Sequence, residues 1–178
     1  MTVTYVLIGP PGSGKSSVGK ALAKKLHGTL RDTDAAIEEV AGKKISQIFI
    51  DDGEDTFRAL EKKIVAETLQ SNFTVVSLGG GAILDEDSQR AIRTATHVIF
   101  LDVSIAQAAP RVGFAKDRPL LAINPRQKWL ELMAKRRPVY ESLATLTLST
   151  DNKKPDEVAQ EIISLYPQSS TEESVRHG

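Results

Sequence analysis

A glycine-rich loop between an apolar segment and an amphipathic segment constrains the fold of this chain more than any other feature. Residues 9–16 read Gly-Pro-Pro-Gly-Ser-Gly-Lys-Ser and fit the pattern G-x-x-x-x-G-K-S/T. The preceding residues 3–8 are apolar and rich in strand formers, whereas Val18, Leu22 and Leu26 recur every four residues and predict a helix. A strand, a loop and a helix in this order are typical of a phosphate-binding loop.

The residue types of this loop suit the chemistry of phosphate binding. Glycines allow backbone N–H groups to turn towards phosphate oxygens and to approach them closely, and the helix adds the positive end of its dipole. Lys15 would supply a positive charge for the β- and γ-phosphates, and the Ser16 hydroxyl would bind Mg²⁺. The alternative is an ordinary glycine-rich turn, which the fixed positions of Lys15 and Ser16 disfavour.

The composition excludes several classes of protein. A chain of 178 residues suggests one domain with a sizeable core, and the absence of cysteine excludes disulfides and thiolate metal sites. The 23 Lys plus Arg residues are balanced by 23 Asp plus Glu residues. The chain therefore has no excess of positive charge that would indicate binding to nucleic acid or to an anionic membrane. No apolar run approaches the roughly 20 residues of a membrane span, and no signal peptide precedes the first predicted strand. We therefore expect a cytoplasmic protein.

Apolar segments alternate with helical segments along the chain. The predicted strands lie near residues 3–8, 29–31, 73–78, 96–101 and 145–149. This alternation predicts an α/β fold, a three-layer doubly wound five-stranded parallel sheet with helices on both faces. More helices lie between the second and third strands than a crossover needs, so residues 33–61 are predicted to be an inserted substrate-binding cap. Residues 1–166 would form a single domain, and the polar tail 167–178 is expected to be disordered.

Polar residues and glycines follow the predicted strands at the carboxyl edge of the sheet, where ligands bind. Asp32-Thr33-Asp34 could be a helix N-cap or part of a site. Gly79-Gly80-Gly81 could be a loose turn, but we favour a backbone segment that lacks side chains so that a ligand can approach it. Asp102 resembles a Walker B metal ligand, and its alternative role, shared with Ser104, is the N-cap of a helix over 104–112.

Basic residues suggest anion binding at three further places. Arg58 lies at helical spacing from Glu54 and Glu61, so its simplest interpretation is a surface ion pair. Residues 113–125 lack a clear period and carry a basic pair, Lys116 and Arg118, which suggests a lid over phosphates rather than a solvated loop. A helix over 126–137 is expected to end at Pro138, and its basic last turn could simply complement the helix dipole.

Together these motifs resemble the shikimate kinase family over residues 3–166. The matching segments are Gly9–Ser17, Asp32–Asp34, Gly53–Glu61, Ser77–Gly81, Arg118–Leu121 and Arg136–Tyr140. The resemblance implies a P-loop NTP hydrolase fold of the nucleoside monophosphate kinase-like group. It also implies transfer of the γ-phosphoryl of ATP to the 3-hydroxyl of shikimate, on the route to chorismate and the aromatic amino acids.

The resemblance further implies the nucleotide and metal sites. The residues that would bind ATP are Gly12, Ser13, Gly14, Lys15, Ser16, Ser17, Arg111, Arg118 and Lys153. Ser16 would ligate Mg²⁺, and Asp32 would help through water, because the third strand ends in glycines where many relatives keep the Walker B acid. Arg111 aligns with a residue that flanks adenine. Lys153 stands where some relatives have an arginine that packs on adenine, and lysine stacks less well.

On the acceptor side, the resemblance implies that Asp34 accepts hydrogen bonds from the shikimate hydroxyls and could act as a base. Arg58 and Arg136 would grip the shikimate carboxylate, which a planar guanidinium can bind through two hydrogen bonds. The glycines that would line this site are Gly79, Gly80 and Gly81, with Gly80 at a hydroxyl. The predicted catalytic residues are Lys15, Asp34 and Arg118, and Arg118 would move in with the lid.

Two other functions are compatible with parts of this pattern. A gluconate kinase-like enzyme shares the loop and the fold, but it gives no reason for a carboxylate-binding Arg58 near Asp34. A non-catalytic nucleotide-binding switch would not require the lid arginine together with Lys15 and Asp34. We therefore expect a monomeric kinase whose partners are shikimate and ATP, without nucleic acid or membrane.

Overall fold

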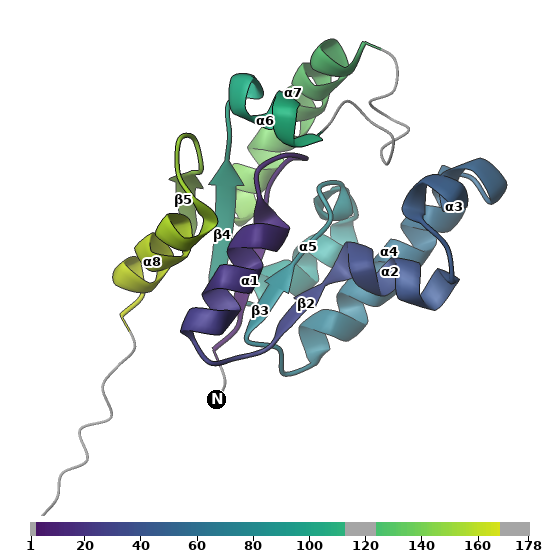
Figure 1. The fold of residues 1–178 in the computed structure, drawn as a ribbon. Helices are drawn as coiled ribbons and strands as arrows, with labels where there is room; N and C mark the ends of the chain where they lie inside the picture. The colour runs from purple at the N-terminus through teal and green to yellow at the C-terminus, as the bar shows by residue number, and fades with distance from the viewer. Residues whose placement is uncertain (1–2, 113–123, 168–178) are drawn as a thin grey trace, which may run out of the picture.

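A five-stranded sheet organises the computed structural model, which describes residues 3–112 and 124–167 (Figure 1). All its strand pairs are parallel, and the strand order is β2-β3-β1-β4-β5. The strands are β1 (Tyr5–Ile8), β2 (Leu30–Asp32), β3 (Val75–Ser77), β4 (His97–Asp102) and β5 (Leu146–Ser149). The predicted doubly wound parallel sheet is therefore confirmed, and β5 lies at an edge.

Helices cover both faces of this sheet, as Figure 1 shows. They are α1 (Lys15–Lys25), α2 (Thr33–Ala41), α3 (Ile45–Asp51), α4 (Glu54–Gln70), the short 3₁₀ helix η1 (Ala82–Leu84), α5 (Glu86–Arg93), α6 (Ile105–Val112), α7 (Pro125–Leu143) and α8 (Pro155–Leu165). Side chains of α1 and α8 share one apolar core, and those of α4, α5 and α7 share another.

The strands alternate between these two cores. Tyr5 and Leu7 pack with α1 and α8, whereas Val6 and Ile8 pack with α4, α5 and α7. All four side chains are buried, because a parallel sheet between two helical layers has no solvated face. Burial on both faces fixes the position of the strand that leads into the glycine-rich loop.

The helices α2, α3 and α4 form a third, smaller core beyond the edge strand β2. Its buried residues are Ala36, Ile37, Ile48, Phe57 and Ile64. In Figure 1 these helices lie together to the right of the sheet. This core fixes α2 relative to α4, and with it the polar residues at the start of each helix.

Helix α7 differs from its prediction. It was expected to end at Pro138, but it extends from Pro125 to Leu143 with Pro138 in its interior. Proline removes a backbone hydrogen bond and usually ends or kinks a helix, yet Tyr140 and Leu143 are buried beyond it and hold the last turn in place. The basic residues before Pro138 therefore lie within the helix rather than in its last turn, so the helix dipole does not explain them.

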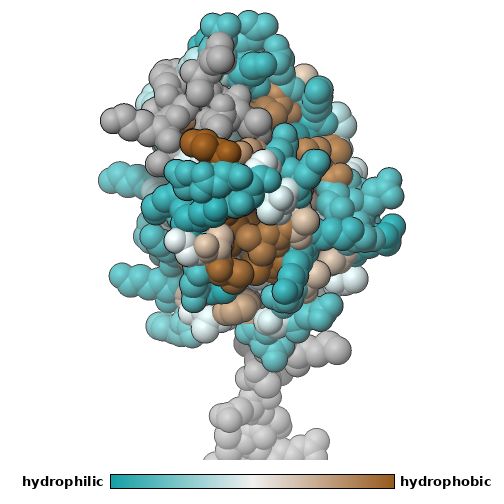
Figure 2. All heavy atoms as spheres, turned by 90° about the vertical axis from the view of Figure 1, so that its right-hand side faces the viewer, coloured by the Kyte–Doolittle hydropathy of each residue, from teal (hydrophilic) through white to brown (hydrophobic). Residues whose placement is uncertain are grey.

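Two predicted segments lie outside the described residues: most of the lid, including Lys116 and Arg118, and the tail from residue 168 onwards. Within the described ranges, no helix is long and apolar enough to cross a membrane. Figure 2 shows one face of the molecule, which is largely hydrophilic around a smaller apolar area. Scattered exposed apolar residues, such as Val40 and Ile50, are ordinary for a protein surface.

Candidate active site

The loop between β1 and α1 has a backbone that suits phosphate. Gly12 and Gly14 have φ angles of 83° and 86°, a left-handed conformation that favours glycine. A Cβ on Gly12 would lie 2.8 Å from the backbone oxygen of Ala108, so a side chain there would also collide with α6. The loop therefore packs closely against α6, and Gly12 is required there both for its conformation and for its lack of a side chain.

The start of α1 completes an anion-binding environment. Gly14 is the N-cap and offers no side-chain hydrogen bond, and the first turn contains no acidic residue. The first backbone N–H groups of a helix lack partners within the helix and carry its positive dipole end. Lys15 Nζ folds over the loop and donates to the carbonyls of Gly9 at 2.7 Å and Pro10 at 3.1 Å.

Ser16 and Asp32 bring two oxygen ligands together beside this loop. The Ser16 hydroxyl donates to Asp32 Oδ2 at 2.5 Å, while Oδ1 accepts from the N–H groups of Asp34 and Ala35 at 3.0 and 3.2 Å. Asp32 is thus an N-cap and a candidate metal-site residue at once, since each oxygen serves one role. A hydroxyl and a carboxylate fit Mg²⁺, which takes one or two protein ligands besides phosphates and water.

A second group of charged side chains surrounds the three glycines after β3. A Cβ on Gly79 would lie 2.5 Å from Asp34 Oδ1 and 3.1 Å from Glu61 Oε2. A Cβ on Gly81 would lie 2.4 Å from Arg58 Nη1, and one on Gly80 would lie 3.3 Å from Arg136 Nη1. The absence of side chains on the three glycines makes room for these four charged groups, which come from α2, α4 and α7.

Arg58 is held more firmly than a surface ion pair would hold it. Its side chain is 26% exposed, and Nη1 donates to Glu61 Oε1 at 2.7 Å, while Nε lies 3.6 Å from Glu54 Oε1. Its guanidinium also lies 5.2 Å from the centre of the Phe57 ring. The orientation of Arg58 towards the glycines is therefore fixed by its own helix.

Glu61 is buried on the apolar side of α4. Burial is the main reason that its pKa is raised above the ordinary glutamate value, and the charge of Asp34 acts in the same direction. The ion pair with Arg58 and the charge of Arg136 oppose this shift of the pKa. Glu61 is therefore a buried carboxyl group that is bonded to Arg58 and whose charged form is favoured by two arginines.

Arg136 is the most deeply buried arginine of this group, with 4% of its surface exposed. Among residues 3–112 and 124–167, its Nε has no hydrogen-bond partner. An unsatisfied buried donor on a charged group is expensive. The same guanidinium lies beside Gly80 through Nη1, so a buried cation with an unused donor is available there for an anionic ligand.

Gly80 also touches the phosphate loop. A Cβ on Gly80 would lie 3.3 Å from Pro11 Cδ and 3.4 Å from the Gly9 oxygen. Helix α7 holds both loops, because the Tyr140 hydroxyl donates to the Gly80 oxygen at 2.6 Å and Trp129 Nε1 donates to the Pro11 oxygen at 2.8 Å. The two sets of charged groups therefore belong to one continuous site.

Comparisons with known proteins show which family this chain belongs to. The family model for shikimate kinase matches residues 11–167. The chain is 52% identical to a shikimate kinase from Thermobifida fusca over 91% of this chain and 94% of the relative. It is 47% identical to one from Rhodococcus jostii over 92% and 97%. The chain belongs to the shikimate kinase family.

Solved structures of shikimate kinases have the same fold. A shikimate kinase from Acinetobacter baumannii in complex with shikimate superposes with a TM-score of 0.90 at 32% identity, covering 93% of each chain. A gluconokinase from Sinorhizobium meliloti superposes with a TM-score of 0.56 at 22% identity, which shows a likeness of fold alone. The chain is a kinase of the shikimate kinase family, and the gluconate kinase alternative is not favoured.

The remaining predicted site residues of this shikimate kinase family member lie near the nucleotide side or outside the described residues. Arg111 Nη1 donates to the Gly12 oxygen and to Thr150 Oγ1, both at 3.2 Å, so it lies against the phosphate loop. Lys153 pairs with Glu161 of α8 at 2.9 Å. Arg118 is outside the described residues, so its predicted role stays a prediction.

Three residues that hold the site together, Glu61, Trp129 and Tyr140, have no predicted role in binding or catalysis. Glu61 was considered only as an ion-pair partner, although it follows Phe57 by four residues on the buried side of α4, which is an unusual place for a glutamate. Trp129 and Tyr140 donate hydrogen bonds to Pro11 and Gly80, and no pattern in the sequence predicts these bonds to loops that lie far along the chain.

Proposed function

We propose that this chain transfers the γ-phosphoryl group of ATP to the 3-hydroxyl of shikimate at the junction of the phosphate loop and the glycines 79–81. The observation that carries the proposal is the position of Gly80. It lies against Gly9 and Pro11 of the phosphate loop and against the guanidinium of Arg136. A carboxylate bound by Arg136 would therefore place the rest of the acceptor beside the phosphates. Phosphoryl transfer depends mainly on such positioning and on charge stabilisation.

On the donor side, the backbone of residues 12–17 and the Lys15 ammonium would bind the phosphates of ATP. Ser16 and Asp32 would hold Mg²⁺, which when bound neutralises phosphate charge. The contact of Arg111 with Gly12 supports a place for Arg111 at the nucleotide. Lys153 would contact adenine only by leaving Glu161, and Arg118 would stabilise charge on the phosphoryl group from the predicted lid.

On the acceptor side, Arg58 and Arg136 would bind the carboxylate of shikimate, since guanidinium groups form paired hydrogen bonds with carboxylates. Asp34 would accept a hydrogen bond from the acceptor hydroxyl. This bond would orient the hydroxyl and would allow Asp34 to receive its proton. The charges of Arg58 and Arg136 favour the charged form of Glu61, which agrees with a positive environment for the carboxylate of the acceptor.

We further propose that the protein acts as a monomer in the cytoplasm. Support comes from the site itself, because α2, α4 and α7 of one chain supply its acceptor residues, and from the balanced charge. Sedimentation velocity of the purified protein, with and without both substrates, tests the oligomeric state. A dimer at the concentrations of the activity assay would contradict this part of the proposal.

The substrate is tested by a coupled assay of ADP release with a panel of hydroxy acids and sugars. Shikimate should be turned over with Mg²⁺ and ATP, and gluconate should not. Removal of Mg²⁺ with a chelator should abolish turnover, and its restoration should recover it. Turnover of gluconate without turnover of shikimate would overturn the proposed function.

The proposed role of Arg58 and Arg136 in shikimate binding is tested by measuring binding without turnover. Arg58→Ala and Arg136→Met should each weaken shikimate binding by roughly 30-fold or more, because each removes charge-assisted hydrogen bonds from a largely buried site. The affinity for ATP should change little. Isothermal titration with each substrate measures both effects, and Arg90→Met, which removes an exposed ion pair on α5, is the matched control. Equal losses of ATP and shikimate affinity would contradict the assignment.

A further inference from the structure

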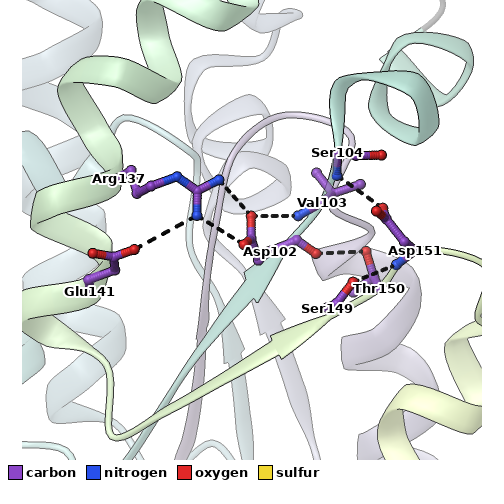
Figure 3. Close-up of polar contacts among 8 residues, drawn as sticks. All are labelled: Asp102, Val103, Ser104, Arg137, Glu141, Ser149, Thr150 and Asp151. Carbon is purple, nitrogen blue, oxygen red and sulfur yellow. Dashed lines mark hydrogen bonds and ion pairs between the residues drawn. The ribbon is translucent and has the colours of Figure 1, made fainter.

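Asp102 at the end of β4 has no role in the donor or acceptor site described above, although its place suggests one. Its carboxylate forms a bidentate ion pair with Arg137 of α7, with Nη1 to Oδ2 and Nη2 to Oδ1 both at 2.9 Å (Figure 3). Oδ1 also accepts from the backbone N–H of Val103 at 2.9 Å. The charge of this carboxylate is therefore already paired with a guanidinium, which makes Asp102 a poorer candidate for a metal ligand than Asp32.

Arg137 follows Arg136 directly on α7. Consecutive residues of a helix point about 100° apart, so one guanidinium reaches Gly80 while the next reaches Asp102. A bidentate arginine–carboxylate pair fixes direction as well as distance. The pair therefore opposes rotation of α7 about its axis, which is the movement that would carry Arg136 away from Gly80.

Aromatic packing connects this ion pair to the acceptor loop. The Arg137 guanidinium lies 5.7 Å from the centre of the Phe100 ring, and Phe100 stacks on Tyr140 with ring centres 5.0 Å apart. Tyr140 in turn donates its hydroxyl hydrogen bond to Gly80. A displacement of Arg137 would thus be transmitted to the same loop by a second route.

The backbone of Asp102 contacts the nucleotide side. Its carbonyl oxygen accepts from the Thr150 N–H at 2.9 Å. It also accepts from the Thr150 hydroxyl at 3.3 Å, a bond that Figure 3 shows. Arg111 bonds to Thr150 and to Gly12 of the phosphate loop. Hydrogen bonds through Thr150 and Arg111 therefore connect Asp102 to the phosphate loop. They hold Asp102 in place, so that its carboxylate can fix the position of α7.

We propose that Asp102 and Arg137 are positioning residues that hold α7 so that Arg136 meets the carboxylate of the acceptor. The inference rests on the proposed function, because it takes Arg136 as a ligand of that carboxylate. The side chains of Arg137 and Asp102 are 40% and 29% exposed, so solvent weakens the contribution of the pair to the free energy of unfolding. Its main effect is on the orientation of Arg136.

The experiment compares Arg137→Met, Asp102→Asn and the double variant by steady-state kinetics and thermal unfolding. The KM for shikimate should rise on the order of tenfold in each single variant, while the KM for ATP should stay within about twofold. The double variant should be no worse than either single variant, since both remove the same interaction. Arg137→Lys should recover part of the loss, because it keeps the charge without the bidentate geometry. Arg90→Met again serves as the control.

Three results would overturn the inference. A lower melting temperature with an unchanged KM for shikimate would show a merely structural pair, equal rises of both KM values would show a general loosening, and additive losses would show independent roles. Failure of the proposed function is distinguishable, because Arg136→Met would then bind shikimate normally. If Arg137→Met does not fold, Asp102→Asn carries the comparison, since it keeps the size of the side chain and an oxygen for Val103.

Discussion

The donor and acceptor sides of this site are built in different ways. On the proposed donor side, consecutive residues 9–16 form the phosphate loop, and even the charged Lys15 bonds to the carbonyls of its own loop. On the acceptor side, the charged side chains come from three separate helices and meet over three glycines. The first site depends on local backbone conformation, and the second depends on how helices pack against one another.

This difference follows from the ligands. Phosphate groups have the same shape and charge in every nucleotide, so backbone N–H groups and a helix terminus bind them without reading the rest of the molecule. A carboxylate and hydroxyls on one small ring need charges placed in defined directions. We therefore expect changes on the donor side to lower turnover, and changes on the acceptor side to alter the selection of the substrate.

The largest effect should follow loss of Lys15. Lys15→Met should lower kcat roughly 10²–10³-fold, because it removes a positive charge from the place where charge develops on the phosphoryl group. Shikimate affinity, measured by titration without nucleotide, should stay within about twofold. Lys20→Met, an exposed position on the same helix, is the control. A parallel loss of shikimate affinity in the Lys15 variant would show that the two sides are not separable.

A smaller and more selective effect should follow Gly81→Ala. The φ of Gly81 is −97°, which alanine adopts readily, so the backbone should tolerate the change. The new Cβ would lie 2.4 Å from Arg58 Nη1, so the guanidinium would have to leave the position in which Glu54 and Glu61 hold it. The KM for shikimate should rise about tenfold, with little change in the KM for ATP or in the melting temperature.

The opposite result is expected for Gly12→Ala on the donor side. Its φ of 83° and the Ala108 oxygen at 2.8 Å leave no relaxed place for a methyl group. In this variant both the affinity for ATP and the melting temperature should fall. If the two alanine variants behave alike in kinetics and in thermal unfolding, the contrast between a backbone site and a side-chain site is wrong.

The sequence predicts the donor side well because its signals are local. Glycine, lysine and serine at fixed spacing after an apolar run predict β1, the loop and α1 within a few residues. The order of apolar and amphipathic segments likewise predicts the five strands, because both faces of a parallel sheet must be buried.

The acceptor side is harder to predict because it depends on tertiary packing. Arg136 and Arg137 have the same residue type in adjacent positions, and no local rule says which guanidinium reaches Gly80. The structure separates them through the rotation of α7, which continues past Pro138 because Tyr140 is buried against Phe100. The resemblance to a family indicates Arg136, but the physical reason for that choice is visible only in the packing.

The smallest predicted effect concerns Glu61 and the pH dependence of stability. Burial raises its pKa in the folded protein above the ordinary value of 4.5, so the folded state holds the proton more tightly than the unfolded state does. This favours the folded state below about pH 4.5, and the advantage is lost as pH rises through the raised pKa. Glu61→Gln should lack this decline, because its side chain does not titrate.

Urea unfolding of both proteins at several pH values, from about pH 4 to about pH 8, measures the difference between them. Other groups titrate alike in both proteins, so this difference isolates Glu61, and Glu67→Gln on the exposed side of α4 is the matched control. Glutamine can still accept the hydrogen bond of Arg58, so the KM for shikimate should change by no more than about threefold. If the free energy of unfolding falls equally in both proteins over this pH range, the pKa of Glu61 is not raised in the folded protein. The charges of Arg58 and Arg136 then offset the effect of burial, and the acceptor side stabilises a negative charge as the donor side does.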